Sequence, residues 1–396
     1  MKIQEYLSTT GNSLDTLSQE LGIEVCRHDH LPLVILNYSS FESPRTHPIV
    51  RECRGLVLEL NSWEVVASCF PRFFNWGEIP EEDQLFDWDT CIAQAKEDGS
   101  LGLLYNYKGE WLFNTRGSFA DLNIIHASVT WANLFKTAIG INSFNDFNSK
   151  LGFDKTYVFE LVSPFNQVVR QYPDPAVYLL STFSKNQELH IQETNDIYKE
   201  MLKSGLQVLQ PEIFEFNGPE EAIQHLESLS VEDETFEGYV FRDANNNRIK
   251  IKSKTYIELH YTRGEGNNLF HPRYQIDWIL NGETEEIINY FPLVEKSINE
   301  HKEIVENAFE DLKQTWEENW QIEDRKEFAE KIMNPKKCRF FGLLFYMRDK
   351  YGKNQNLSLL KQMWKESDEF ILKLLFDTKK RYPKEKKYFS DCESKQ

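Results

Sequence analysis

The sequence predicts an α+β domain followed by an all-helical domain. Short runs rich in β-branched and aromatic residues, separated by turn residues, fill the first two-thirds of the 396-residue chain. After about residue 261 the pattern changes to apolar residues at helical spacing with charged residues between them. We therefore expect antiparallel sheets with flanking helices in residues 1–262 and helices alone in residues 263–396.

Two β-hairpins are expected in the first domain. One turns at Lys108-Gly109, and the other turns at the three asparagines of residues 245–247. Both turns are flanked by runs with the composition of strands. Further β-rich runs lie at 55–60, 90–93, 157–162 and 176–180, and helical segments are expected near 12–21, 119–137 and 219–229.

The second domain is expected to be helical throughout. From residue 292 to residue 320 apolar residues recur at helical spacing, and the opposite positions carry charge. Pro335 ends the following short helix, and further helices are expected at 340–351 and 357–376. The Lys- and Glu-rich tail from Lys379 is expected to fray.

Composition limits the class of protein. Hydrophobic residues make up 40% of the chain and aromatic residues 14%, as is typical of a globular protein. The N-terminus has no apolar run and no later segment approaches a membrane span, so we expect no membrane association. The six cysteines are scattered, which indicates reduced thiols in a cytoplasmic protein and argues against a structural zinc site.

Charge is distributed unevenly along the chain. The formal net charge is −18, whereas proteins that bind nucleic acid usually carry a basic surface. Residues 241–263 nevertheless contain six Lys or Arg residues against Asp243 and Glu258, a local net charge of plus four (six minus two). Because the net charge does not determine the field inside a cleft, an acidic chain can still contain a basic site.

The segment Lys96-Glu97-Asp98-Gly99-Ser100 lies between a β-rich run and the first hairpin. Taken alone, so short a motif is more often an ordinary exposed loop. The alternative is a covalent lysine: Gly99 would let the backbone approach a phosphate, and a neutral Lys96 amine could attack phosphorus. Since nearby cations favour the neutral amine, this hypothesis requires a second cluster of positive charge.

The run Arg248-Ile-Lys250-Ile-Lys252 provides such a cluster. Alternate residues of a strand share a face, so three cations line one side of this run and two isoleucines line the other. An edge strand with a solvated basic face is the ordinary alternative. However, the second hairpin pairs this strand with the run that begins at Glu237. Cations for phosphates beside a carboxylate for a divalent metal suit nucleotidyl transfer.

Two more charged residues lie in or next to apolar runs. Glu160 interrupts the run 157–162, where a carboxylate either faces solvent or holds a ligand hydroxyl. Arg54 precedes the run that begins at Gly55, and it could form a structural ion pair. Neither residue is convincing by itself.

The order of these motifs resembles that of the covalent nucleotidyltransferase superfamily and, within it, the bacteriophage-type RNA ligase 1 family. The resemblance extends from about residue 38 to residue 260. It rests on five motifs in order: Glu52-Cys-Arg54-Gly, Lys96-Glu97-Asp-Gly99-Ser, Phe159-Glu160-Leu-Val-Ser-Pro, Glu237-Gly238-Tyr-Val, and Lys250-Ile-Lys252-Ser with a following Tyr-x-x-Leu-His. It implies a nucleotidyltransferase domain at residues 1–262.

The resemblance assigns a role to each motif. Lys96 would form lysyl-AMP, and Arg54 and Glu160 would hold the ribose of ATP. Glu237 would help to organise Mg²⁺ (or Mn²⁺), and Lys250 and Lys252 would contact the phosphates and help to displace pyrophosphate. The resemblance also places six further residues at the nucleotide: Arg72, Phe74, Glu97, Gly99, Arg116 and Gly238. Arg72 and Arg116 stand where the family usually has lysine, which keeps the charge but alters the hydrogen-bond geometry. An aromatic residue near Tyr38 aligns only loosely and receives no role.

The function that the resemblance implies is ATP-dependent RNA ligation. A 5′-phosphate and a 3′-hydroxyl would be joined through lysyl-AMP and RNA-adenylate, in RNA repair by a monomeric protein. A kinase or phosphatase acting upstream could prepare the ends. The helical domain would recognise the RNA, for which a nicked tRNA anticodon loop is one candidate. Its basic residues are as well explained by a solvated surface: Lys336, Lys337, Arg339 and the run 379–387.

Three alternatives remain open at this point. A DNA ligase or an mRNA guanylyltransferase normally adds a small β-barrel after the last basic strand, whereas helices are expected here. A catalytically inactive nucleotide- or RNA-binding module is disfavoured because the lysine nucleophile, the carboxylates and both later lysines are all present. A helical interaction protein would not need the series of motifs.

Overall fold

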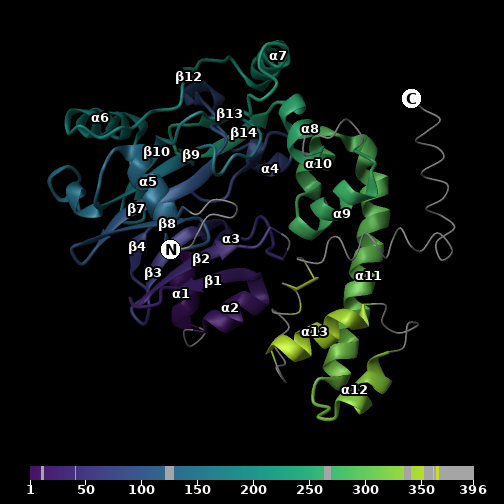
Figure 1. Cartoon of the computed structure of the whole chain (residues 1–396). Coiled ribbons are helices and arrows are strands. Elements are labelled where there is room, and N and C mark those ends of the chain that lie inside the picture. The colour runs from purple at the N-terminus through teal and green to yellow at the C-terminus, as the bar shows by residue number, and fades with distance from the viewer. Residues whose placement is uncertain are drawn as a thin grey trace. The chain divides into compact units, whose positions relative to one another are not determined.

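The structure is a computed structural model (Figure 1) that describes residues 1–9, 13–40, 42–120, 129–262, 269–333, 340–351, 360, 363 and 364. It divides into two compact units, Met1–Glu265 and Gly266–Gln396. The first unit contains three β-sheets with helices around them. In the described part of the second unit, every regular element is a helix. The expected α+β and helical composition is confirmed.

The first sheet is antiparallel, in the order β1-β2-β3-β4. Its helices cover the apolar residues of one face, and α2 begins after Ser13, whose side chain accepts a hydrogen bond from the Thr16 backbone. The helix near 12–21 and the strand near 55–60 are thus confirmed. The elements are α1 (Lys2–Thr9), α2 (Leu14–Leu21), β1 (Ile23–Arg27), β2 (Leu33–Tyr38), α3 (Pro48–Glu52), β3 (Arg54–Glu59) and β4 (Val65–Ala67).

The second sheet is also antiparallel, in the order β11-β10-β9-β7-β8. Lys108 and Gly109 have φ angles of 51° and 94°, as a tight hairpin turn requires, so the first predicted hairpin is confirmed. The strands are β7 (Ser100–Tyr107), β8 (Glu110–Thr115), β9 (Lys155–Val162), β10 (Ala176–Ser184) and β11 (Gln187–Glu188).

Two helices, α5 (Trp131–Ile139) and α6 (Ile191–Lys203), contact this second sheet. The helix predicted at 119–137 begins later than expected, after the Thr130 side chain caps it. Phe119 instead forms an isolated bridge with Asn114 of β8, and residues 121–128 lie outside the described residues. The prediction was therefore wrong for Phe119.

The third sheet has the order β12-β6-β13-β14-β5 and includes one parallel pair, β14 with β5. The second predicted hairpin, β13 with β14, is confirmed. The strand expected at 90–93 begins only at Ile92, after a short 3-10 helix (Trp88–Thr90), whereas α7 has the predicted bounds. The elements are β5 (Phe74–Asn75), β6 (Ile92–Ala95), β12 (Ile213–Phe214), α7 (Pro219–Leu229), β13 (Gly238–Arg242), β14 (Arg248–Lys252) and, directly after it, α8 (Lys254–Thr262).

The sheets of the first unit share apolar cores. Val57 of the first sheet belongs to the same buried cluster as Leu103 and Val158 of the second sheet. In the third sheet, Tyr239 and Phe241 of β13 are fully buried beneath α7. Residues 96–99 connect β6 of the third sheet to β7 of the second sheet. The fold therefore places the predicted nucleophile segment where these two sheets meet.

The described part of the second unit consists of helices around buried apolar residues such as Trp278 and Trp316. The helix predicted at 292–320 is confirmed, with a 3-10 turn (Pro292–Val294) as its first residues. Nearly all of the helix predicted at 357–376, together with the basic residues 336, 337, 339 and 379–387, lies outside the described residues. The helices are α9 (Pro272–Asn281), α10 (Thr284–Tyr290), α11 (Glu295–Asn319), α12 (Arg325–Ile332) and α13 (Phe341–Tyr351). No described helix is both long enough and apolar enough to span a membrane.

Candidate active site

Lys96 lies immediately after β6, at the start of the connection to β7. Its backbone N–H donates to the carbonyl oxygen of Gly238, at the start of β13 (2.8 Å). β13 is the central strand of the third sheet. The backbone of Lys96 is therefore held by the sheet, while its side chain remains 25% exposed.

Lys96 and Lys252 share one buried carboxylate. Their Nζ atoms lie 2.9 Å and 3.2 Å from the two carboxylate oxygens of Glu237, whose side chain is 4% exposed. Burial raises the pKa of Glu237, but the two ammonium groups outweigh burial and hold this pKa below its ordinary value. Lys252 lies opposite Gly238 in the β13–β14 pairing, so the predicted hairpin creates this contact.

The basic strand β14 shows the predicted alternation. Ile249 and Ile251 are buried on one face, and the three cations occupy the other. β14 lies between β13 and β5, so it is not an exposed edge strand. The solvated-edge interpretation of this strand is therefore wrong.

Arg248, on the same face of β14, pairs with a different carboxylate from the one that Lys252 contacts. Its Nη1 atom donates to a carboxylate oxygen of Glu188 (2.8 Å), and Arg242 lies 3.4 Å from the same carboxylate. All three side chains are buried. Burial raises the pKa of Glu188, but the two guanidinium groups lower it below its ordinary value. Arg248 borders the pocket described below with its charge already compensated.

A second group of cations surrounds the Tyr38 hydroxyl, at the end of β2. Arg116 donates to this hydroxyl (3.3 Å), and the Arg72 guanidinium lies 4.3 Å from the centre of the Tyr38 ring. Burial raises the pKa of Tyr38, but four cations outweigh burial and lower it to about 8: Arg116, Arg54, Arg72 and Lys250. Sequence reasoning gave Tyr38 no role, because the aromatic residue there aligned only loosely with the family.

Arg54 begins β3 beside Gly55, which adopts a left-handed conformation (φ 72°). A Cβ atom on Gly55 would lie 3.2 Å from the Cα atom of Arg116, so this glycine permits the two arginines to approach. The Arg54 guanidinium lies over the rings of Phe70 and Phe73, at 4.6 Å and 5.2 Å. Its buried Nη1 atom has no hydrogen-bond partner among the described residues. The structural ion pair that we considered for Arg54 is therefore not formed with any described residue.

Glu160 faces the pocket from the middle of the second sheet. In β9 it lies opposite Leu101 of β7 and Tyr178 of β10. Burial raises its pKa, the Lys96 ammonium opposes this rise, and the negative Glu237 adds to it, so that the pKa of Glu160 is about 7. A substantial fraction of this carboxyl is therefore protonated near neutral pH, when it can donate a hydrogen bond as well as accept one.

The glycines of two motifs face protein backbone. A Cβ atom on Gly99 would lie 2.4 Å from the carbonyl oxygen of Leu161, and one on Gly238 would lie 2.2 Å from that of Ile251. We expected Gly99 to admit a phosphate; the structure instead places β9 against it. Both glycines are thus required by close packing of strands.

Asp98 and Glu97 fix the segment that carries Lys96. Buried Asp98 accepts hydrogen bonds from the backbone N–H groups of Val169 and Arg170 (2.8 Å each) and from the Tyr256 hydroxyl of α8 (2.7 Å). The Tyr172 hydroxyl donates to Glu97 (2.8 Å) and accepts from the Asp98 backbone (3.0 Å). Sequence reasoning gave Asp98 no role, although its central place in the motif was a signal.

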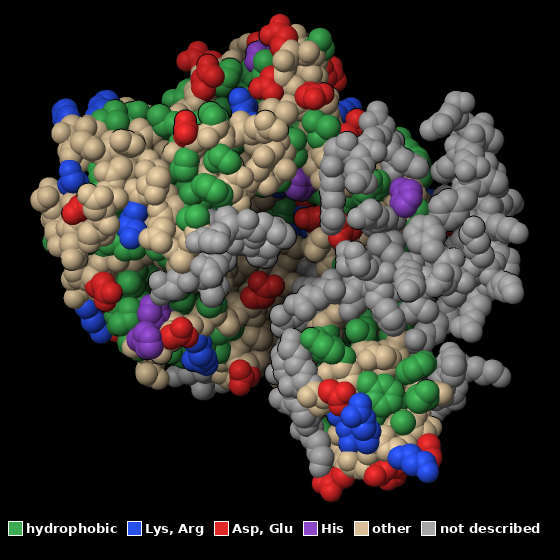
Figure 2. All heavy atoms as spheres, in the orientation of Figure 1, with side chains coloured by type: hydrophobic (Ala, Val, Ile, Leu, Met, Phe, Trp, Pro, Cys, Tyr) green, Lys and Arg blue, Asp and Glu red, His purple; other side chains and the backbone are tan. Residues whose placement is uncertain are grey.

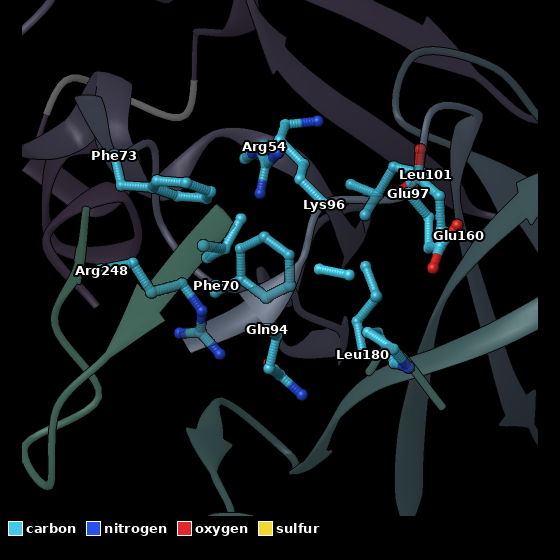
Figure 3. Close-up of a pocket in the computed structure, with 13 residues that line it drawn as sticks. Arg54, Phe70, Phe73, Gln94, Lys96, Glu97, Leu101, Glu160, Leu180 and Arg248 are labelled. Carbon is cyan, nitrogen blue, oxygen red and sulfur yellow. The ribbon is translucent and has the colours of Figure 1, made fainter. Parts of the chain in front are cut away.

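These elements enclose a pocket, which Figure 3 shows with Arg54 and Lys96 on one side of the Phe70 ring and Gln94 on the other. The Gln94 side chain lines this pocket, is 8% exposed and has no hydrogen-bond partner among the described residues. Its amide was not predicted as a site residue. Four predicted residues line the pocket: Arg54, Lys96, Glu97 and Glu160. Apolar side chains complete the walls: Phe70, Phe73, Ala95, Leu101, Leu180, Pro211 and Val240.

The other predicted residues are not part of this lining. Phe74 is buried, and the Arg72 guanidinium lies 5.6 Å from its ring centre. On the face seen in Figure 2, Lys and Arg side chains are scattered rather than gathered in one patch. The cations of β13 and β14 lie instead beside buried groups: Arg242 and Arg248 at Glu188, Lys250 near Tyr38, and Lys252 at Glu237. Within the described part of the chain, no group of three His, Cys, Asp or Glu residues is arranged to hold a metal ion.

The chain was compared with known proteins. A family model described as RNA ligase, of the phage T4 RNA ligase 1 type, matches residues 52–256, just over half of the chain. A putative bifunctional polynucleotide kinase/RNA ligase of Autographa californica nuclear polyhedrosis virus is 32% identical over 292 residues. These residues are 70% of this chain but only 40% of the viral protein.

Two proteins of lower sequence identity are also similar to this chain. An RNA ligase of Rhodothermus phage RM378 is 23% identical over 380 residues, covering 79% of this chain and 85% of the phage protein. An archaeal ATP-dependent RNA ligase of known structure has a TM-score of 0.45 and 15% identity, over 87% of this chain and 90% of that one. On the strength of the family match, this chain belongs to the phage T4 RNA ligase 1 family.

Proposed function

We propose that this chain is an ATP-dependent RNA ligase that carries AMP on Lys96. The observation that carries the proposal is the position of the Lys96 amine beside a pocket whose Arg54 and Gln94 side chains offer uncommitted hydrogen-bonding groups. Membership of the RNA ligase family supports the same function. The roles given below to single residues are part of this proposal.

The pocket has groups suited to each part of ATP. The Gln94 amide can both donate to and accept from the edge of an adenine base, which presents a donor beside an acceptor. Glu160, with its raised pKa, can hydrogen-bond a ribose hydroxyl. The cations around Tyr38 would attract the phosphates.

In the first step, the neutral Lys96 amine attacks the α-phosphorus of ATP. A nitrogen–phosphorus bond forms, the bond from the α-phosphorus to the bridging oxygen breaks, and pyrophosphate leaves. Lys96 must first lose a proton, and Glu237 is the group within hydrogen-bond distance of its Nζ atom. Lys252, which also contacts Glu237, would remain the partner of this carboxylate once the amine has reacted.

In the second step, a 5′-phosphate oxygen of the RNA attacks the phosphorus of lysyl-AMP. The nitrogen–phosphorus bond breaks, Lys96 recovers its proton, and RNA-adenylate forms. In the third step, a 3′-hydroxyl attacks the 5′-phosphorus of the RNA and AMP leaves. All three steps are in-line transfers, which depend on positioning and on compensation of phosphate charge.

A divalent cation would be held by Glu237, with Glu160 and Glu97 nearby. Carboxylate oxygens suit Mg²⁺ or Mn²⁺, and Mg²⁺ commonly binds through one or two carboxylates, water and substrate phosphates. The lack of a three-residue metal cage among the described residues is compatible with that mode. Such a cation would stabilise the negative charge on the reacting phosphates.

We also propose that this reaction serves RNA repair. One viral relative is named a putative bifunctional polynucleotide kinase/RNA ligase, which supports a kinase or phosphatase that prepares the ends for this chain. The described helices of Gly266–Gln396 would recognise the RNA. A nicked tRNA anticodon loop remains a candidate substrate.

Intact mass after incubation with ATP and Mg²⁺ tests the proposal. We expect the wild type to gain one AMP with ATP but not with GTP, and Lys96→Ala to gain none. Lys199→Ala, which removes an exposed lysine from α6, is the matched control and should react like the wild type. Folded wild-type protein that is free of AMP at the start and gains none would instead favour a nucleotide- or RNA-binding module without catalysis.

A further inference from the structure

The connection between β9 and β10 spans residues 163–175. Its residues 163–173, called the loop below, are fixed to the segment that carries Lys96. Asp98 accepts hydrogen bonds from the Val169 and Arg170 backbone, and the Tyr172 hydroxyl bonds the two residues that follow Lys96. These contacts join the second half of the loop to the nucleophile segment.

The first half of the loop is fixed by Asn166. Its side-chain nitrogen donates to the Ser100 hydroxyl (3.0 Å) and to the Leu161 carbonyl oxygen (2.8 Å). The Ser163 hydroxyl accepts a hydrogen bond from the Phe165 backbone (3.1 Å). Both halves of the loop are thus hydrogen-bonded to residues 97–100, which follow Lys96. The first half is also hydrogen-bonded to Leu161 of β9.

This fixed loop exposes two apolar side chains. Phe165 and Val168 are 47% and 45% exposed, and neither belongs to a buried core of the unit. An exposed aromatic ring on an ordered loop provides a flat apolar surface for a ligand. Because the backbone of the loop is already ordered, binding loses less conformational entropy. Core packing therefore does not explain Phe165.

The charge of the loop indicates which part of a ligand it suits. No carboxylate occurs between Glu160 and Asp174, although the chain as a whole has a net charge of −18. Arg170 is the only cation of the loop, and it pairs with Asp233 (3.3 Å). The loop itself therefore carries no negative charge, although Asp174 follows it directly, and its apolar surface suits a base better than a phosphate.

From this geometry we infer that Phe165 and Val168 form a stacking platform for the terminal base of the RNA strand that carries the 5′-phosphate. That end must reach the Lys96 phosphorus in the second step and remain beside it in the third. Single-stranded nucleic acids are commonly held by bases stacked on aromatic side chains. This inference rests on the proposed function, and it identifies the 5′-terminal base as the part of the RNA that the loop contacts.

The test follows transfer of AMP from preformed lysyl-AMP protein to a 5′-phosphorylated oligoribonucleotide, in single turnover. Phe165→Ala should take up AMP from ATP like the wild type. It should then need about 5- to 150-fold more RNA for half-maximal transfer, as expected for the loss of one base–aromatic stack of about 1–3 kcal/mol. Phe165→Trp should restore the wild-type dependence on RNA concentration.

Two controls make the outcome specific. Phe153→Ala removes an aromatic ring of similar exposure (53%) at the other end of β9 and should not change the RNA concentration needed. On an oligonucleotide whose 5′-terminal nucleotide is abasic, wild type and Phe165→Ala should behave alike. A Phe165→Ala protein with unchanged dependence on RNA, or a penalty that persists on the abasic strand, would overturn the inference. Failure of the wild type to take up AMP would instead refute the proposed function.

Discussion

The Tyr38 hydroxyl ionises more readily than an ordinary phenol, because four cations outweigh the effect of its burial. Above the pKa of about 8, the phenolate compensates part of the positive charge that we propose attracts ATP. The KM for ATP in lysyl-AMP formation should therefore rise above pH 8, by at most about tenfold per pH unit for one proton. Tyr38→Phe should lose this rise, so the two profiles should diverge with pH. Parallel profiles from pH 7 to 9.5 would contradict the assignment.

The raised pKa of Glu160 predicts that the stability of the protein depends on pH. Its pKa is raised from 4.5 to about 7 by burial, so between these values the folded state binds more protons than the unfolded state. Stability contributed by this group therefore falls as pH rises from about 4.5 to 7. Glu160→Gln should remove that fall, and its Tm relative to wild type should increase over this range. A difference in Tm that is constant with pH would argue against a buried, neutral Glu160.

Sequence reasoning reached some residues of the candidate site and missed others for a physical reason. Lys96 and Glu237 lie in motifs whose neighbours along the chain restrict their chemistry. Tyr38 and Gln94 lie in ordinary apolar strands, and only the pairing of β2 with β3 and of β6 with β13 brings them to the site. Such contacts between distant segments leave no local pattern in one sequence.

Among the elements, the connection from β6 to β7 has the tightest geometry. A Cβ atom on Gly99 would lie 2.4 Å from the Leu161 carbonyl oxygen, so Gly99→Ala must displace the segment that carries Lys96. We expect about 1–3 kcal/mol lower stability from overpacking and at least about tenfold slower lysyl-AMP formation. Gly117→Ala is the matched control, because its Cβ would meet nothing within 4 Å. Equal rates for the two variants would show that Gly99 does not position Lys96.

The elements with clear turn or cap signals were predicted best. Gly109 and the asparagines of residues 245–247 determine both hairpins, and Pro219 begins α7 at the predicted residue. The helices α6 and α8 were not predicted, because α6 buries only Thr194 and Met201 and α8 follows β14 after one residue. A helix that buries few residues gives little periodicity to detect, and a helix that follows a strand after one residue has no clear start signal.

At the scale of the whole molecule, the two compact units predict separable activities. The residues proposed to bind ATP and to carry AMP all lie in Met1–Glu265, which has its own apolar cores. A protein that ends at Glu265 should therefore form lysyl-AMP at a rate close to that of the full chain. It should seal a nicked tRNA less well than the full chain, at equal concentrations of lysyl-AMP protein. Equal sealing would show that the helical unit does not recognise RNA.

The positions of the cations explain how an acidic protein can bind an anionic substrate. The net charge of −18 is a sum over the whole chain, whereas Lys252 and the arginines around Tyr38 gather beside buried groups of the first unit. A cleft can attract phosphates even when the whole protein repels them at long range. The sequence showed the local excess of positive charge on one strand, but not that cations from separate segments gather around the Tyr38 hydroxyl.

The most direct measurement is the site of covalent modification. Wild-type protein incubated with ATP and Mg²⁺ would be digested under conditions that preserve a phosphoramidate bond, and its peptides would be sequenced by mass spectrometry. We predict AMP on Lys96, with no other lysine modified. AMP found on another residue, such as Lys252 or Lys250, would show that Lys96 is not the nucleophile.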